Sequence, residues 1–434
     1  MIQKVLNKYR IESFFVISLM ILPFLPTWGS LDKIGQQYLF LSFLQICNSL
    51  YLYSVSNKSD FKLTILECSL FGTLFISLAS FFASDFLLQS WIEFMRLAIY
   101  VMVFFNLTFT LKRVKNIDKL LLAVLLFFLT SESIAVLVDF LKIYEFDNPF
   151  GRSRLVEGLS SNLNVGAFSI LIKVPLIIYF LNKTKSFFYK LLLYIILAFS
   201  FFSIFIMSSR GALIGIIVFS VLFISFSIFQ YFRKNSLLDL FIYLFILGIT
   251  FLSHSYLFQN RTDFRVTSRL VSFQGDNSTN YRLGYYKDAV DAILIHPILG
   301  MGIGTWKVNS IGFIGEKMQE YEVPYHVHND FLQFGAETGI IGMFFYLSIF
   351  LIPLVIILRK LLKSKPNQDV FLDFLLMSAL IIFTIDSCIN FPKARPYTMI
   401  NILFYLAIIN HYYFSSFNPK LKISIKYLQL IFIL

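Results

Sequence analysis

The sequence predicts an all-α integral membrane protein with about 12 transmembrane helices and one large loop, on the outer side, between the ninth and tenth spans. Three observations predict this fold class. Of the 434 residues, 57% are hydrophobic and only 14% are charged, whereas ordinary soluble proteins carry about 25% charged residues. The mean hydropathy is +0.74. So little polar surface excludes a single soluble enzyme domain, a repeat solenoid and a disordered chain.

Apolar runs divide the chain into candidate spans. A helix needs about 17 to 25 apolar residues to cross a bilayer. The first run follows Lys4, Lys8 and Arg10 and has no small-residue cleavage site after it, so we expect an uncleaved helix. The twelve runs are 11–28, 37–55, 63–82, 91–111, 117–141, 163–181, 187–207, 211–231, 237–257, 337–358, 370–391 and 397–414.

Basic residues predict the orientation of these spans. If the N-terminus is cytoplasmic, the inner segments hold about three times as many Lys and Arg as the short outer loops. Both termini are therefore expected inside. The net charge of +12 is explained by these loops rather than by a nucleic-acid site. The three cysteines lie in apolar runs and predict neither a disulfide framework nor a metal cluster.

The expected organisation has four parts: spans one to nine at 1–257, a large outer loop at 258–336 that carries the candidate active site, spans ten to twelve at 337–414, and a cytoplasmic tail at 415–434. A loop of this length is usually functional or disordered. Within it, residues 281–297 have apolar side chains at helical spacing, which predicts an amphipathic helix lying along the membrane surface.

The segment YHVHNDFLQFGAETGIIG, residues 325–342, is the densest cluster of polar side chains. His326, His328 and Asp330 spell the start of a hydrolase metal site, but the next residue is Phe331 rather than a third histidine. A plain structural explanation is that Asn329 or Asp330 caps the helix that follows. The remaining interpretation is a histidine general base, since histidine has the side-chain pKa nearest to neutral.

Several arginines lie in the outer loops. Arg210 falls in the tight turn SSRGALIG, where it either anchors the interface by snorkelling or clamps an anionic headgroup. The other candidate anion contacts in the outer loops are Arg282, Arg265, Arg269, Arg152 and Arg154.

Two further features were weighed as signs of other functions, nucleotide binding and transport. The glycines of PILGMGIGTW, residues 297–306, are explained by a tight turn, since the nucleotide-loop pattern lacks its strand and its G-K-[ST]. Charges within spans keep a transporter as an alternative, because such residues can line a midplane cavity. These charges include the expected Glu93–Arg96 pair, Glu132, Asp139, Lys173 and Asp386.

Together these motifs resemble the O-antigen ligase and O-antigen polymerase superfamily, the membrane glycosyltransferases that use undecaprenyl-diphosphate-linked glycans. HVHNDFLQFGAETGIIG is similar to the family's His-Asn stretch, and RLGYYKDAVDAILIHPILGMGIGTW to the run that precedes it. SSRGALIG resembles the Ser-Arg-Gly turn, and DSCINFPKARP the late Asp and Phe-Pro turn. GLSSNLNVGAFSI resembles the Asn-x-x-Ala helix entry, with Leu163 in place of the usual proline. The charge bias puts all these motifs near the outer face.

The resemblance implies roles for particular residues. Arg210 and Arg282 would bind the lipid diphosphate, His328 would activate the acceptor hydroxyl, and His326 would orient His328. Arg152, Arg154, Arg265 and Arg269 would be secondary anion contacts, and Tyr325 or Trp306 could stack on sugar rings. The resemblance also implies an inner-membrane enzyme with its site on the periplasmic side, inversion at the anomeric carbon, and no cofactor, nucleotide sugar or metal.

The expected partners are an undecaprenyl-diphosphate-linked glycan donor, a lipid A-core or glycan acceptor, and membrane lipids, with no nucleic acid. The chemical identity of the acceptor distinguishes the possible activities. Lipid A-core would make the protein an O-antigen ligase, a lipid-linked repeat would make it a polymerase of O-antigen or capsule, and a protein Ser or Thr an O-oligosaccharyltransferase. The alternative from another class is a transporter or flippase for polysaccharide or lipid.

Overall fold

The computed structural model describes residues 10–26, 33–56, 60–145, 156–160, 162–234, 237–259, 266, 277–314, 324–365, 368–414 and 422–433. These residues are helical almost throughout, so the all-α fold class is confirmed. The exception is one short antiparallel pairing of β1 (Asp60–Lys62) with β2 (Lys422–Ser424), in which Asp60 lies opposite Ser424.

Ten helical segments in the described part of the chain are long and apolar enough to cross a membrane. The first and twelfth expected spans do not reach that length: α2 (Arg10–Ser18) continues only as a 3-10 turn, and α17 (Pro396–Ile409) ends in a π-helical turn. The protein is a multi-pass membrane protein, and its total of twelve spans stays a prediction.

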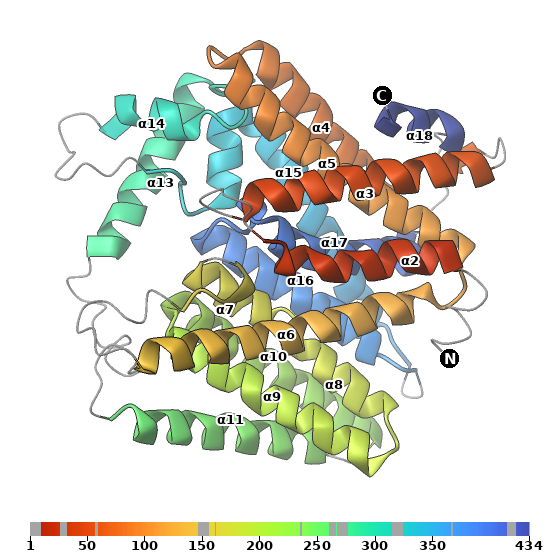
Figure 1. Cartoon of the computed structure of the whole chain (residues 1–434), viewed down its shortest axis with the longest axis vertical. Coiled ribbons are helices and arrows are strands. Elements are labelled where there is room, and N and C mark those ends of the chain that lie inside the picture. Colours follow the sequence, from red (N-terminus) through yellow and green to blue (C-terminus); the bar gives the residue numbers. More distant parts are fainter. Residues whose placement is uncertain are drawn as a thin grey trace. The chain divides into compact units, whose positions relative to one another are not determined.

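The chain forms two compact units that alternate along the sequence. Unit 1 comprises Met1–Leu120, Asn277–Ile356 and Ser387–Leu434, and unit 2 comprises Leu121–Asp276 and Ile357–Asp386. The elements of unit 1 (Figure 1) are α2, η1 (Leu19–Phe24), α3 (Ile34–Val55), β1, α4 (Ile65–Phe82), α5 (Leu87–Arg113), α13 (Asn277–Ile295), α14 (Trp306–Ile314), most of α15 (Asp330–Leu362), η6 (Pro392–Ala394), α17, η7 (Asn410–Phe414), β2 and α18 (Ile425–Ile433).

Helix α5 is the centre of unit 1 and packs against α3, α4 and α17. Its fully buried Asn106 donates to the backbone and side-chain oxygens of Gln45 on α3 and accepts a hydrogen bond from Gln429 on α18, at 3.2 Å. A buried amide in an apolar bundle needs such partners, because an unpaired polar group there is costly. Residues 425–433 of the expected tail thus pack within the unit.

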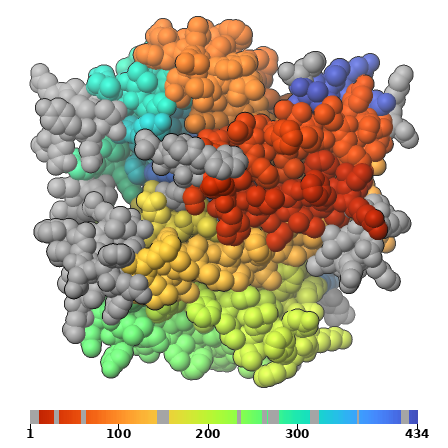
Figure 2. Space-filling model, in the orientation of Figure 1, coloured from red at the N-terminus to blue at the C-terminus, as the bar shows by residue number. Residues whose placement is uncertain are grey.

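The outer surface of unit 1 is apolar, as lipid contact requires. Figure 2 shows α2 and α3 (red to orange) on the near face of the molecule. On them Phe14 is 61% exposed and Phe43 69% exposed, whereas the polar Asn48 and Gln45 of α3 are buried. Polar side chains inside and large apolar ones outside invert the pattern of a soluble protein.

Unit 2 is a bundle whose core is aromatic. Phe226 stacks on Phe374 with ring centroids 4.2 Å apart, and Tyr243 packs edge-on against Phe219 and Phe223. Its elements are the larger part of α6 (Ile117–Glu145), η3 (Gly158–Ser160), α7 (Leu163–Leu171), α8 (Val174–Lys183), α9 (Phe187–Met207), α10 (Arg210–Lys234), α11 (Leu238–Leu257), the end of α15 and most of α16 (Phe371–Ile389).

The sixth expected span, 163–181, is broken between α7 and α8. Pro175 stands at the start of α8, where a missing N–H is tolerated, and Lys173 lies at the break. The Lys173 ammonium is fully buried and pairs with Glu132 on α6 at 2.9 Å. Ser160 and Ser169 also donate to this carboxylate, so the buried pair is enclosed by hydrogen bonds.

The tenth span begins earlier than predicted. Helix α15 starts at Asp330 rather than at 337, and Gly339 interrupts it with φ of 76° and ψ of 177°. Only glycine adopts such backbone readily. The kink separates a polar first segment, 330–338, from the apolar span that follows, and it gives the carbonyl of Pro297 access to the N–H of Ile340 at 2.9 Å.

Candidate active site

Residues 324–329, here called the histidine loop, lead into helix α15. The Asn329 side chain accepts hydrogen bonds from the backbone N–H groups of Phe331 and Leu332 at 3.1 and 3.0 Å, so the predicted N-cap is confirmed. His328 has a φ of 61°, in the left-handed region. Non-glycine residues in that region are strained and gather at functional sites.

Both histidine rings contact the same aromatic ring. His326 stacks on Phe391, with centroids 4.2 Å apart and planes 14° apart, and His328 meets Phe391 edge-on at 5.1 Å. Burial lowers the pKa of His326 to about 3 and that of His328 to about 4, and the nearby Arg282 adds to the second shift. Both imidazoles are therefore neutral at physiological pH and able to accept a proton.

A cavity of about 570 Å³ opens beside the two histidines. Its size lies in the range of small-molecule sites. Its wall combines aromatic, cationic and carboxylate side chains from α5, the histidine loop, α15 and the turn after α16. The lining residues are Ile34, Gly35, Gln89, Glu93, Arg96, Gly304, Lys307, Tyr325, His326, His328, Asp330, Gln333, Glu337, Phe391, Lys393, Ala394 and Arg395.

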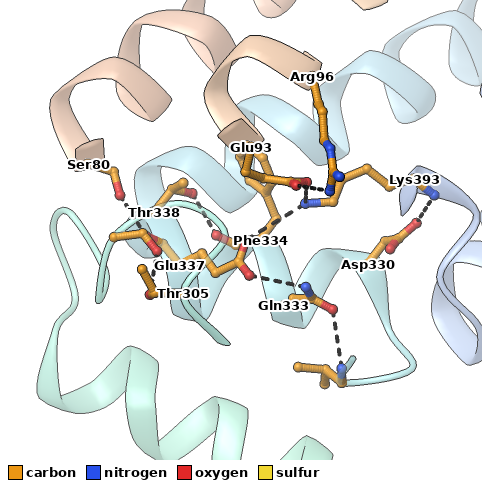
Figure 3. A network of polar contacts seen from close by, with 12 residues as sticks. Ser80, Glu93, Arg96, Thr305, Asp330, Gln333, Phe334, Glu337, Thr338 and Lys393 are labelled. Atoms are coloured by element: carbon orange, nitrogen blue, oxygen red, sulfur yellow. Dashed lines mark hydrogen bonds and ion pairs between the residues drawn. The ribbon is translucent and has the colours of Figure 1, made fainter. Parts of the chain in front are cut away.

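Three carboxylates, Glu93, Asp330 and Glu337, surround Lys393 in the wall of this cavity (Figure 3). We call these four residues the lysine cluster. Burial alone would lower the pKa of Lys393, but the three carboxylates outweigh it and hold the pKa above its ordinary value. Lys393 is therefore a charged ammonium. Glu93 also pairs with Arg96 at 3.3 Å, as their three-residue spacing predicts.

The backbone of the glycine turn, residues 300–304, lies in close contact with Glu93 and Glu337, which line the cavity. Gly300, Gly302 and Gly304 all have positive φ, which confirms the predicted tight turn. The N–H of Gly302 donates to the carbonyl of Glu337 at 3.1 Å. A Cβ atom on Gly300 would overlap the backbone of Glu337, and one on Gly304 would lie 2.5 Å from the Cβ of Glu93. Only glycine allows this approach.

Helix α13 brings Arg282 to the histidine loop. This helix confirms the helix predicted at 281–297, with Ala289 and Ala292 buried and Leu294 72% exposed. One turn after Arg282, the Tyr286 hydroxyl contacts the carbonyl oxygens of His328 and Cys388 at 3.0 and 3.1 Å. Arg282 itself donates to the carbonyl of Ile389 at 3.1 Å. Arg282 and both histidines belong to unit 1, and the charge of Arg282 acts on His328.

Arg210 belongs to unit 2, where it is the first residue of α10. The turn before it contains Ser208, with a φ of 49°. The Ser209 hydroxyl donates to the side chain of Asn164 at 2.8 Å, and the neighbouring Asn162 caps α7. The Ser-Arg-Gly turn and the asparagine-rich entry to α7, 44 or more residues apart in the sequence, thus meet in one place.

The other predicted contacts have different outcomes. Arg152, Arg154, Arg265 and Arg269 lie outside the described residues. Trp306 is fully buried under α13, packed with Ala289, Val327 and other apolar side chains, so our prediction that it could stack on a sugar is wrong. Tyr325 is 58% exposed at the cavity and remains available for stacking.

Sequence reasoning did not bring the lysine cluster together. Lys393 entered only as an outer-loop charge and within the motif DSCINFPKARP, and Glu337 only within the motif HVHNDFLQFGAETGIIG. The usable signal was the segment FPKARP, in which two cations sit between prolines directly after an apolar run. Within the described residues, no group of three or more His, Cys, Asp or Glu side chains is arranged to hold a metal ion.

Residues 195–347 match the family model described as O-antigen ligase. Over this segment the chain is similar to the O-antigen ligase family. The resemblance predicted from the motifs is therefore confirmed over about a third of the chain, including Arg210, Arg282 and both histidines. Glu93, Lys393 and Arg395 lie outside the matched residues. No curated protein matches the chain.

Proposed function

We propose that this protein is a metal-independent glycosyltransferase that moves a glycan from undecaprenyl diphosphate to a hydroxyl of lipid A-core on the periplasmic face of the inner membrane. The observation that carries the proposal is the placement of two neutral histidines, next to Arg282, at a cavity of about 570 Å³. The family match supports the reaction class.

The proposed reaction needs a base and an anion clamp. The acceptor oxygen attacks the anomeric carbon while its proton passes to His328, and the bond from that carbon to the diphosphate oxygen breaks. The diphosphate leaves with the bonding electrons. Its growing negative charge is stabilised by arginine guanidinium groups, which present planar forks of N–H donors to phosphate oxygens. The family resemblance implies Arg210 and Arg282 for this role. Attack opposite the leaving group inverts the anomeric configuration.

The first experiment measures transfer by the purified protein in lipid nanodiscs, with an undecaprenyl-diphosphate-linked oligosaccharide as donor and lipid A-core as acceptor. We expect His328→Ala and Arg210→Ala each to abolish transfer without changing membrane insertion. The matched controls are His296→Ala and Arg359→Ala, because both wild-type side chains are exposed and lie outside the cavity. Normal product from His328→Ala or Arg210→Ala would remove that residue from the site.

A genetic test identifies the acceptor. The gene is deleted, and surface polysaccharide is compared after supplying wild type or His328→Ala. Core without polymer, with lipid-linked polymer accumulating, would support the ligase. Core bearing a single repeat would replace it with a polymerase, and loss of glycan from protein Ser or Thr with an O-oligosaccharyltransferase. An unchanged pattern would contradict all three and favour a transporter.

A further inference from the structure

Lys393 is held at three points, although it lies in a short turn. Its backbone N–H donates to the carboxylate of Asp330 at 2.9 Å, and its carbonyl accepts from the Tyr100 hydroxyl at 3.1 Å. Its ammonium lies 3.5 Å from Glu93 and 3.7 Å from Glu337. The side chain is only 6% exposed. A buried ammonium is tolerated when it is paired, so these contacts fix the residue in place.

One path of contacts leads from the Lys393 ammonium to the histidine loop. The Glu337 carboxylate that faces Lys393 also accepts a hydrogen bond from the Gln333 amide at 3.1 Å. The oxygen of the same amide accepts the backbone N–H of Val327 at 3.2 Å. Figure 3 shows this chain from Lys393 through Glu337 to Gln333. Because Val327 stands between His326 and His328, the path ends on the backbone of the loop itself.

A second path leads through the turn to the histidine rings. Lys393 is the middle residue of η6, and Phe391 immediately precedes that turn. The N–H of Ala394 returns to the carbonyl of Phe391 at 3.1 Å, so the position of the turn sets the position of the Phe391 ring. This ring contacts both imidazoles. Lys393 therefore supports the backbone of the histidine loop through Glu337 and Gln333, and it supports both imidazole rings through Phe391.

We propose that Lys393, through Glu337 and Phe391, is the positioning residue for the His326–His328 pair. The expected effect on activity rests on the proposed function. The expected effect on structure does not: the histidine loop should lose its order when the Lys393 ammonium is removed.

The physical consequence of removing the ammonium is uncompensated negative charge. Glu93, Asp330 and Glu337 would remain with no central cation in a buried place, and like charges at short range repel. Helices α5 and α15 would then be pushed apart at this level, or the carboxylates would take up protons. Either response displaces Glu337 from Gln333 and loosens the turn that carries Phe391.

The test compares Lys393→Met with Lys393→Arg and with the control Lys183→Met. Lys183 forms an exposed ion pair with Asp369 in unit 2, so its removal is the same chemical change without burial. Hydrogen exchange of the peptide covering 324–334 and histidine-selective labelling of His326 and His328 are read by mass spectrometry. We expect at least tenfold faster exchange and labelling in Lys393→Met, and wild-type values in Lys393→Arg and Lys183→Met. Unchanged protection in Lys393→Met would overturn the proposal.

A charge-balanced variant covers the case in which Lys393→Met does not fold. Lys393→Met combined with Glu337→Gln removes one cation and one carboxylate but keeps an amide oxygen that can accept from Gln333. We expect this protein to accumulate and still to label faster at both histidines, because its turn has lost the ammonium anchor. Wild-type labelling in the double variant would overturn the proposal as well.

Activity gives the readout that a purely structural lysine would leave unchanged. In Lys393→Met, turnover per folded molecule is expected to fall at least tenfold, and the acid limb of the pH–rate profile to move to higher pH. The shift follows because the pKa of the base His328 is lowered mainly by burial, and the loosened loop admits water to its ring. If wild type transfers no glycan, the proposed function fails while the labelling result still decides this inference.

Discussion

Phe391 stacks on His326, with ring planes 14° apart, and presents its edge to His328. One aromatic side chain thus touches both candidate catalytic residues, and it comes from a turn more than 60 residues further along the chain. The arrangement makes the orientation of the imidazoles depend on the turn after α16.

Phe391→Leu is expected to lower turnover about tenfold, with little change in protein level. Leucine fills similar space but cannot stack, and aromatic contacts contribute about 0.5–1.5 kcal/mol each, where 1.36 kcal/mol corresponds to tenfold in rate. The matched control is Phe241→Leu, because Phe241 is 64% exposed on α11 in unit 2. Equal rates for Phe391→Leu and wild type would show that the stacking does not orient the base.

Transfer is expected to persist well below neutral pH. Because burial lowers the pKa of His328 to about 4, the imidazole stays neutral and competent as the pH falls through 6.5, the ordinary histidine value, and becomes charged only near pH 4. The folded protein loses stability over the same interval, since the unfolded chain binds protons there that the folded chain does not. Rates measured from pH 3.5 to 8 check this, and an acid limb at 6.5 would contradict it.

Gly300→Ala is expected to lower the free energy of unfolding by at least about 2 kcal/mol and to abolish transfer. The backbone has a φ of 66°, which costs an L-residue about 1–2 kcal/mol, and the added methyl would overlap the backbone of Glu337. Gly284→Ala is the control, because nothing lies within 4 Å of its added methyl. On α13 that change should stabilise by about 0.5–1 kcal/mol. Thermal unfolding in detergent distinguishes the two.

Lys173→Met is expected to destabilise unit 2 by about 3–5 kcal/mol, the usual cost of leaving one buried charge without its partner. Adding Glu132→Gln should recover most of the loss, because the glutamine is neutral and can still accept from Ser160. The midpoint of thermal unfolding measures both. A stable Lys173→Met protein that loses glycan export but not transfer would give this pair a transport role instead.

Chelation is expected to leave transfer unchanged, because the proposed mechanism places arginine charge on the diphosphate. The assay is repeated after incubation with EDTA and after adding back a divalent ion. Activity that disappears with EDTA and returns with the ion would restore the metal interpretation of His326, His328 and Asp330.

Local sequence patterns predicted the spans, a helix cap and a turn. Apolar runs located ten helical segments of membrane-spanning length. A helix cap was predicted at Asn329 or Asp330 and lies at Asn329, and the positive-φ glycines were predicted as a turn. Each of these depends on a few neighbouring residues. The kink at Gly339 and the break before Pro175 were missed, because both residues lie inside predicted spans and the hydropathy of a span does not register a change of backbone direction.

The lysine cluster could not be predicted, since its members are far apart in the sequence. Glu93, Glu337 and Lys393 come from three helices or turns, and nothing in one segment indicates its partners in the others. Trp306 was misjudged for a related reason. An aromatic residue beside a candidate site can face the ligand or the core, and only the packing of α13 decides that it faces the core.

The alternation of the two units along the sequence has a consequence for biosynthesis. The Tyr100 hydroxyl donates to the backbone carbonyl of Lys393, which is made 293 positions later, and the cavity that Lys393 lines also needs the histidine loop. Until the ribosome has passed Arg395, α5 carries Glu93 and Arg96 without the lysine that neutralises the cluster. The half-made protein is therefore expected to wait in the membrane with an open, inactive site, and to become competent only when its last helices insert.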